Sequence, residues 1–146
     1  MDNNEKFSTF YLDGLWFGIK VEEIQEVLRY QDITPVPLAP PAILGLINLR
    51  GQIITAIDLR RRLGLSELAV SRQSINIVVR GGEDTASLLV DTLGEVVEVG
   101  QETLETPPDT IDAASRSLIR GVHKLKDGLM HIVNTEEAMR LVAEGI

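Results

Sequence analysis

The chain has no cysteine and only two histidines among its 146 residues, and this shortage excludes several kinds of chemistry. Without cysteine there is no disulfide, thiolate nucleophile or thiolate metal site, which fits a reducing compartment. His123 and His131 have no third ligand at a metal-site spacing, so we interpret both as structural. No Gly-x-Ser-x-Gly, Walker or Gly-x-Gly-x-x-Gly motif is present. The sequence therefore predicts no enzyme, no cofactor and no metal.

Long apolar runs and an excess of basic residues are also missing. No stretch approaches the roughly 18 apolar residues of a membrane span, and the first residues lack the basic and apolar pattern of an export signal. The net charge of −8 repels nucleic acid. The one basic cluster, at residues 60–62, begins an expected helix, and we interpret it as a solvated face. We expect a soluble cytoplasmic protein with no nucleic-acid partner and no direct membrane insertion.

Short apolar stretches that alternate with turn residues predict a mainly β protein. Asp13-Gly14 favours a type I′ hairpin turn between its flanking strands. Four prolines between residues 35 and 41 predict an extended crossover without regular structure. Asp58 is placed to cap a helix over 59–64. The expected strands cover about residues 6–12, 15–21, 24–30, 44–49, 52–57, 74–80 and 85–91.

The second half of the chain repeats the order of the first. The pattern of residues 21–27 recurs at 90–96, and the stretch from Gly45 to Ile57 recurs from Gly121 to Val133. Asn134 then takes the capping role, with Glu137 as its capping-box partner. Two such units predict two small barrels packed together. We place them at about residues 14–64 and 74–133, with residues 6–12 and a C-terminal helix at 135–143 packing across both.

The two halves differ most at one hairpin. The first half reads Asn48-Leu49-Arg50-Gly51 between two apolar strands, whereas the second has an ordinary Asp-Gly turn. Arg50 is therefore not a requirement of the shared fold. An always-charged group with five donors on a rigid turn suits recognition of a partner. The alternative is structural: Arg50 pairs with Glu26 across the interface between the barrels and orients them.

This motif and its surroundings resemble the CheW family of chemotaxis coupling proteins. The resemblance also includes Phe17-Gly18-Ile19, Ile24-Gln25-Glu26-Val27, Thr34-Pro35-Val36-Pro37, Leu89-Val90-Asp91 and the hairpin from Gly121 to Val133, and it covers about residues 6 to 142. It implies a single CheW-like domain over 1–146, made of two five-stranded SH3-like barrels with an apolar interface. Thr55 replaces a common proline and Ser87 a frequent glycine, which bears on partner preference.

The resemblance implies an adaptor in two-component signal transduction. Its partners are the regulatory domain of the histidine kinase CheA and the cytoplasmic tip of chemoreceptors, which place it at membrane-associated arrays. The matching interaction positions are Ile24, Glu26, Gly45, Arg50, Gly51, Ser87 and Val96. Four of these positions also have a structural alternative: Ile24 and Val96 as core residues, and Gly45 and Gly51 as glycines that the backbone geometry requires.

Two other functions remain open at this point. One is a CheW-like coupler in another pathway, such as surface motility, pili or second-messenger control. The other is a small ligand-binding barrel with a pocket between its lobes.

Overall fold

The computed structural model describes residues 4–65, 74–107 and 113–140, and most of these residues lie in β-strands. Only short helical segments accompany the strands, as the alternating apolar pattern predicts. The strands are β1 (Glu5–Leu12), β2 (Leu15–Lys20), β3 (Ile24–Leu28), β4 (Ile43–Leu49), β5 (Gln52–Asp58), β6 (Ile75–Gly81), β7 (Asp84–Val90), β8 (Thr92–Val99), β9 (Leu104–Glu105), β10 (Ile119–Leu125) and β11 (Gly128–Val133). The helical segments are η1 (Val21–Glu23), α1 (Leu59–Arg62), η2 (Gln101–Thr103), α2 (Ala113–Arg116) and α3 (Thr135–Ala138).

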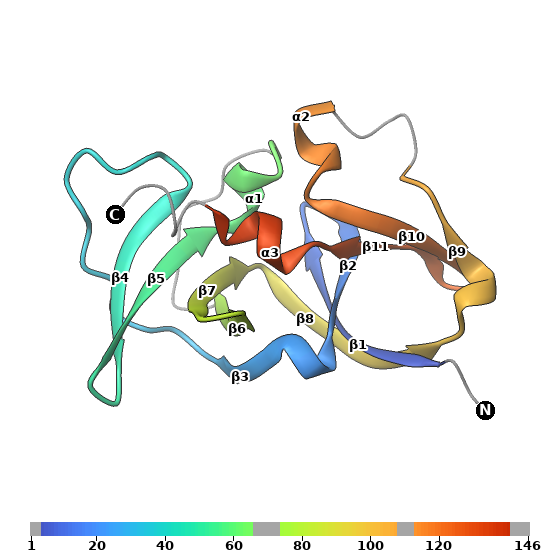
Figure 1. Ribbon diagram of the computed structural model, residues 1–146, viewed down its shortest axis with the longest axis horizontal. Coiled ribbons are helices and arrows are strands. Elements are labelled where there is room, and N and C mark those ends of the chain that lie inside the picture. Colours follow the sequence, from blue (N-terminus) through green and yellow to red (C-terminus); the bar gives the residue numbers. More distant parts are fainter. Residues whose placement is uncertain (1–3, 66–73, 108–112, 141–146) are drawn as a thin grey trace.

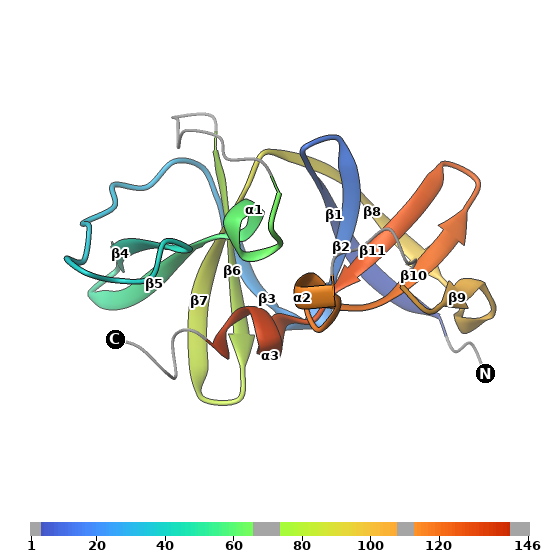
Figure 2. The same ribbon diagram turned by 90° about the horizontal axis from the view of Figure 1, so that it is seen from above.

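The strands form two curved sheets that lie side by side, with α1, α2 and α3 over their junction (Figures 1 and 2). One sheet has the order β8-β1-β2-β11-β10-β9, and we call it the six-stranded barrel. The other has the order β3-β6-β7-β5-β4, and we call it the five-stranded barrel. The predicted mainly β fold of two packed barrels is confirmed. The sixth strand is the two-residue β9, whose counterpart in the five-stranded barrel is a single bridge between Thr34 and Leu46.

Each barrel combines strands from both halves of the chain, which differs from the predicted segments 14–64 and 74–133. The hairpin β1–β2 joins β8 to β11, and the hairpin β6–β7 joins β3 to β5. In each barrel the inserted hairpin pairs in parallel with a strand from the other half of the chain, β2 with β11 and β7 with β5. The expected unit at 6–12 is thus a strand of one barrel and not a segment across both. The chain passes from one sheet to the other at two short connections, η1 between β2 and β3 and Asp91 between β7 and β8.

Three apolar clusters fill the molecule. The largest lies at the junction and combines residues of both barrels, among them Phe10, Phe17, Ile57 and Leu88. A second, with Ile47 and others, belongs to the five-stranded barrel, and a third, with Phe7, belongs to the six-stranded barrel. Burial of apolar surface is the main force that holds such layers together, so the apolar junction joins the barrels into one body.

The predicted helix caps are present. The Asp58 carboxylate accepts a hydrogen bond from the Arg61 amide at 3.3 Å, and the Asn134 side chain accepts one from the Glu137 amide at 3.2 Å. The predicted capping box is wrong, because the Asn134 amide donates to Leu118 and the Glu137 carboxylate pairs with Arg140. Helix α3 ends at residue 138, whereas the expected helix extended to 143, and residues 141–143 lie outside the described residues.

Candidate functional site

The hairpin between β4 and β5 carries the arginine that distinguishes the two halves of the chain. Leu49 pairs with Gln52, so the loop consists of Arg50 and Gly51 alone. Both have positive φ, 52° and 86°, which is the signature of a type I′ turn. The Asn48 side chain accepts a hydrogen bond from the Gly51 amide at 2.9 Å and braces the turn. Left-handed backbone costs a residue other than glycine about 1–2 kcal/mol, so Arg50 occupies this position against its conformational preference.

Arg50 forms an ion pair and a hydrogen bond with Glu26 on β3. The expected pairing therefore exists, but it does not orient the barrels. Both residues belong to the five-stranded barrel, where β3 is one edge strand and β4 the other. The pair thus connects the two edges of one curved sheet, and the part of the structural hypothesis that placed it across the barrel interface is wrong.

Exposure shows how much this pair contributes to folding. The Arg50 side chain is 70% exposed and the Glu26 side chain 23% exposed. An ion pair open to solvent contributes about 0–1 kcal/mol, which does not exceed the strain at Arg50. Stability alone does not account for the arrangement. It places a guanidinium and a carboxylate together at the surface, with the exposed Ile53 two residues beyond the turn.

The other sequence-predicted positions separate into exposed and buried groups. Gly51 is exposed at the turn, and Val96 is 62% exposed on β8, the edge strand of the six-stranded barrel. Ile24 is half-buried on β3 and packs against the junction cluster. The structure therefore brings Glu26, Arg50 and Gly51 into one site, with Ile24 on the same edge strand and Val96 on the other barrel.

Gly45 and Ser87 are both buried. A Cβ at Gly45 would lie 2.2 Å from the Thr34 carbonyl oxygen, so glycine lets the crossover pack against β4 there. The Ser87 hydroxyl donates to the Asn76 side chain at 2.8 Å inside the five-stranded barrel. Neither residue therefore offers a surface for direct contact with a partner.

Arg60 is buried, so the interpretation of residues 60–62 as a solvated face is wrong at this position. Its Nε donates to both oxygens of Asp91, at 2.9 and 3.0 Å, and an Nη lies 3.7 Å from the Asp13 carboxylate. The Asp13 amide also donates to Asp91. Burial by itself raises the pKa of Asp91, but the hydrogen bonds from Arg60 and Asp13 outweigh it and hold that pKa below its ordinary value. Arg60 thus connects α1, the β1–β2 turn and the Asp91 crossover.

The two histidines occupy separate buried positions. Across the hairpin His123 faces Met130 and His131 faces Val122, so their side chains point to opposite faces. His123 hydrogen-bonds the Thr103 hydroxyl at 2.7 Å, and His131 donates from Nδ1 to the Trp16 carbonyl at 2.8 Å. Burial lowers the pKa of His123. Within the described ranges no three ligating side chains gather as a metal site, and no helix there is long and apolar enough to cross a membrane.

The paired barrels, with a charged turn at one sheet edge, define a binding module. The CheW-like domain model matches residues 6–143, and the chain belongs to the CheW family, whose members are scaffold proteins and not enzymes. A chemotaxis protein CheW of Treponema pallidum is 30% identical over 137 residues, which cover 90% of this chain and 79% of the relative. Protein FrzA of Myxococcus xanthus is 27% identical, with 94% and 81% covered.

A solved structure agrees with the fold. The scaffolding protein TtCheW from Thermoanaerobacter tengcongensis superposes with a TM-score of 0.81 at 33% identity, and the match covers 89% of this chain and 88% of that one.

Sequence reasoning missed the contacts of two residues near the site and the junction. Asn48 was part of the quoted motif, yet its bond to the Gly51 amide was not foreseen, although asparagine side chains often accept hydrogen bonds from backbone amides in turns. Arg60 was read as solvated because charge runs usually are. Its partner Asp91 is 31 residues away in the chain, and only the fold brings the two together.

Proposed function

We propose that this protein is an adaptor of bacterial chemotaxis that couples chemoreceptors to the histidine kinase CheA, and that the Glu26–Arg50 face of the five-stranded barrel contacts a partner. The observation that carries the site is the turn itself. Arg50 accepts a strained backbone to hold an exposed guanidinium beside Glu26, at little or no net gain in stability. Family membership and the names of the relatives support the pathway.

The proposed mechanism needs no chemistry of its own. The adaptor binds the regulatory domain of the kinase through one surface and the helical tip of a receptor through another, in the cytoplasm at receptor arrays. Ligand-driven movement of the receptor then shifts the kinase between active and inactive populations by differential affinity. Glu26, Arg50 and Gly51 make direct contacts, with Ile24 and Val96 as apolar neighbours on the two edge strands. Gly45 and Ser87 maintain the barrel that presents them.

The likeness to FrzA keeps a second function in view, a coupler in a pathway other than chemotaxis. The physical mechanism is the same for both functions, and only the receptor and kinase differ. Comparing the binding of CheA with the binding of other kinases of the same organism distinguishes the two functions.

Calorimetry of the protein with the cognate CheA regulatory domain and with a receptor-tip fragment tests the proposal. Three variants separate recognition from structure: Arg50→Glu, the swapped pair Glu26→Arg with Arg50→Glu, and Arg80→Glu as an exposed arginine of the same barrel. Circular dichroism and the fluorescence of Trp16, the single tryptophan, report folding.

We expect Arg50→Glu to weaken binding to one of the two partners at least about tenfold, as charged interface groups do. The swapped pair restores the internal ion pair but not partner binding, while Arg80→Glu binds as wild type. Restored binding in the swapped pair would show that the ion pair serves the barrel alone. Wild-type protein that binds neither partner would overturn the chemotaxis assignment.

A further inference from the structure

The edge strand β8 of the six-stranded barrel has a β-bulge, which lies where Val96 reaches the surface. The pairing of β8 with β1 shifts in register there, so that Gly94 and Glu95 together lie opposite Thr9. A bulge of this kind puts one extra residue into a strand, bends the strand and re-aims the side chains beside it. Val96, one of the proposed partner contacts, is the first residue beyond the bulge.

The five-stranded barrel has a bulge at the corresponding position. Its edge strand β3 shifts in register against β6 just before Glu26. Glu26 corresponds to Glu95 in the internal repeat of the sequence. The side chain at this shift is the one that pairs with Arg50. In both barrels the bulge thus lies at a residue of the proposed partner site, so whatever fixes the bulge also fixes that residue.

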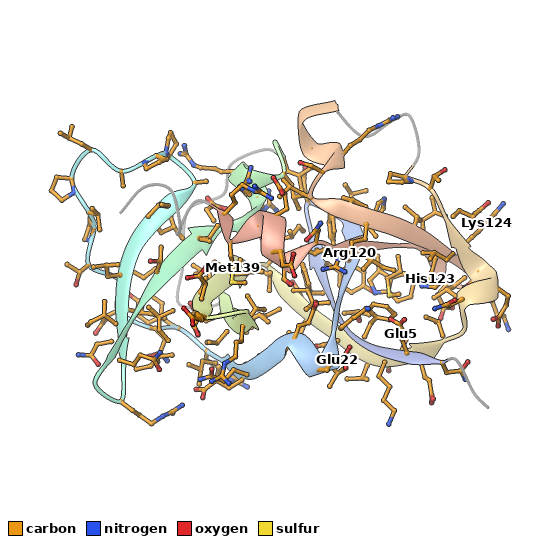
Figure 3. The ribbon with its side chains drawn as sticks, viewed as in Figure 1. Glu5, Glu22, Arg120, His123, Lys124 and Met139 are labelled. Carbon is orange, nitrogen blue, oxygen red and sulfur yellow. The ribbon has the colours of Figure 1, made fainter. Side chains whose placement is uncertain are left out.

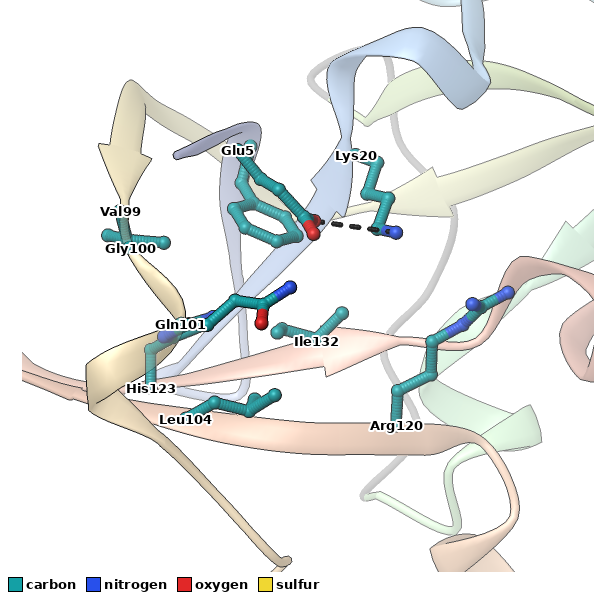
Figure 4. A pocket seen from close by; sticks show the side chains of 10 residues that line it. Glu5, Lys20, Val99, Gly100, Gln101, Leu104, Arg120, His123 and Ile132 are labelled. Atoms are coloured by element: carbon teal, nitrogen blue, oxygen red, sulfur yellow. Dashed lines mark ion pairs between the residues drawn. The ribbon is translucent and has the colours of Figure 1, made fainter. Parts of the chain in front are cut away.

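Thr9 is fully buried and points into the six-stranded barrel. Alternate residues of β1 face the interior. Glu5 lines a small cavity of that barrel together with His123 (Figures 3 and 4), and Phe7 packs on the His123 ring. Thr9 is the next residue in this series, with 0% of its surface exposed. Its hydroxyl donates a hydrogen bond to the Glu95 carbonyl oxygen, so a side chain of the neighbouring strand holds the bulge from inside.

The corresponding residues of the five-stranded barrel do not make this hydrogen bond. Thr9 corresponds to Val78 on β6, which is buried in the apolar cluster of that barrel and has no hydroxyl. Gly94 corresponds to Gln25. A Cβ at Gly94 would lie 2.4 Å from the Thr9 hydroxyl oxygen, so the hydroxyl reaches the bulge because residue 94 has no side chain. Thr9 and Gly94 therefore form a matched pair that the shared fold does not require.

Strand β8 is anchored on both sides of the bulge, so the hydrogen bond acts on the bulge itself. Before the bulge, Leu93 keeps the register with β1. Beyond it, Val99 is buried and points into the barrel, where it lines the cavity with Ile132 (Figure 4). Val96 lies between these anchors and is 62% exposed. It pairs with Ser8, whose side chain points away from the barrel interior, so Val96 points outward as well.

We propose that Thr9 is a positioning residue: its hydroxyl fixes the conformation of the β8 bulge and thereby the place at which Val96 meets a partner. This inference rests on the proposed function, in which Val96 is a contact. Thr9 is buried and touches no partner itself. Loss of its hydroxyl releases the bulge carbonyl and changes how Val96 is presented, without unfolding the barrel, because valine occupies the corresponding position of the other barrel.

Three variants of the full protein separate positioning from stability. Thr9→Val is nearly isosteric and removes the hydroxyl, whereas Thr9→Ser keeps the hydroxyl and removes the methyl group. Ser115→Ala is the matched control, because it also removes a buried hydroxyl that donates to a backbone carbonyl, that of Leu63 at 2.7 Å. Calorimetry with the CheA regulatory domain and with a receptor-tip fragment measures binding, and methyl NMR of the free protein reports Val96. A double-mutant cycle with Val96→Ala shows whether Thr9 acts through Val96.

We expect Thr9→Val to weaken binding of the partner that Val96→Ala also weakens, by about fivefold, the effect of one neutral hydrogen bond. It has no further effect in the Val96→Ala background, while Thr9→Ser and Ser115→Ala bind as wild type. The Val96 methyl signals shift in Thr9→Val and not in Ser115→Ala.

Two kinds of failure are distinguishable. Unmoved Val96 signals in Thr9→Val, an additive cycle, or equal losses of binding in Thr9→Val and Ser115→Ala would each overturn the role of Thr9 while partner binding stands. Wild-type protein that binds neither partner, or Val96→Ala that binds both as wild type does, would overturn the proposed contact itself and with it this inference.

Discussion

Arg60→Met is the perturbation that best tests how the barrels are held together. Methionine keeps the length and apolar stem of arginine but removes the guanidinium, which leaves Asp91 without its main donors. Asp91 is the single residue by which the chain passes from β7 in one barrel to β8 in the other. The substitution therefore acts at the connection between barrels and not on an isolated surface pair.

The magnitude follows from burial. Removal of one partner from a fully buried ion pair costs about 3–5 kcal/mol. The Arg60 side chain is 8% exposed, but the Asp91 side chain is 25% exposed and regains some hydration. We therefore expect a loss of about 2–3 kcal/mol in the free energy of unfolding. The matched control is Arg61→Met: its side chain is 35% exposed and lies 3.7 Å from Asp58, so a loss below about 1 kcal/mol is expected.

Urea unfolding followed by circular dichroism and by Trp16 fluorescence measures the loss in the free energy of unfolding for both variants. Trp16 lies on β2 of the six-stranded barrel, so its signal reports that barrel, whereas circular dichroism reports both. A double-mutant cycle with Asp91→Asn should give a coupling of about 1–3 kcal/mol. If Arg60→Met costs no more than Arg61→Met, or if the cycle shows no coupling, the assignment of Arg60 as the tie between barrels is refuted.

Three further predictions concern stability. Gly45→Ala should lower the free energy of unfolding in urea by about 2–4 kcal/mol, because the new Cβ meets the Thr34 carbonyl oxygen. Gly51→Ala has open space around it and should cost only about 1 kcal/mol of backbone strain. Equal losses in the two variants would contradict the packing argument. Ser87→Ala should cost about 1–2 kcal/mol, since a buried hydrogen bond to Asn76 is lost, and an unchanged midpoint would count against it. Because the pKa of Asp91 is lowered in the folded state, its contribution to the free energy of unfolding is complete above the unfolded pKa of about 3.9 and is lost as the pH falls through the folded pKa. The stability difference between wild type and Asp91→Asn should therefore shrink in acid. A difference that does not change with pH would refute this prediction.

Local patterns were sufficient for several elements of this fold, though not for the ends of the helices. The alternation around Asp13-Gly14 predicted β1 and β2 within a residue or two, and the caps at Asp58 and Asn134 were placed correctly. Such features depend on neighbours in the chain, through strand periodicity, turn geometry and unpaired amides. The family resemblance, carried by the Asn48-Leu49-Arg50-Gly51 motif and its surroundings, was also legible in the sequence and is confirmed by the family match.

The sequence by itself therefore determined a mainly β, repeated chain of the CheW family with an unusual arginine on its first hairpin. Only the tertiary structure decided which hairpin joins which barrel, because both repeats carry the same strand pattern and either pairing satisfies it locally. It also decided that Arg60 and not Arg50 ties the barrels. These features depend on contacts between residues far apart in the chain, whose energies no local pattern contains.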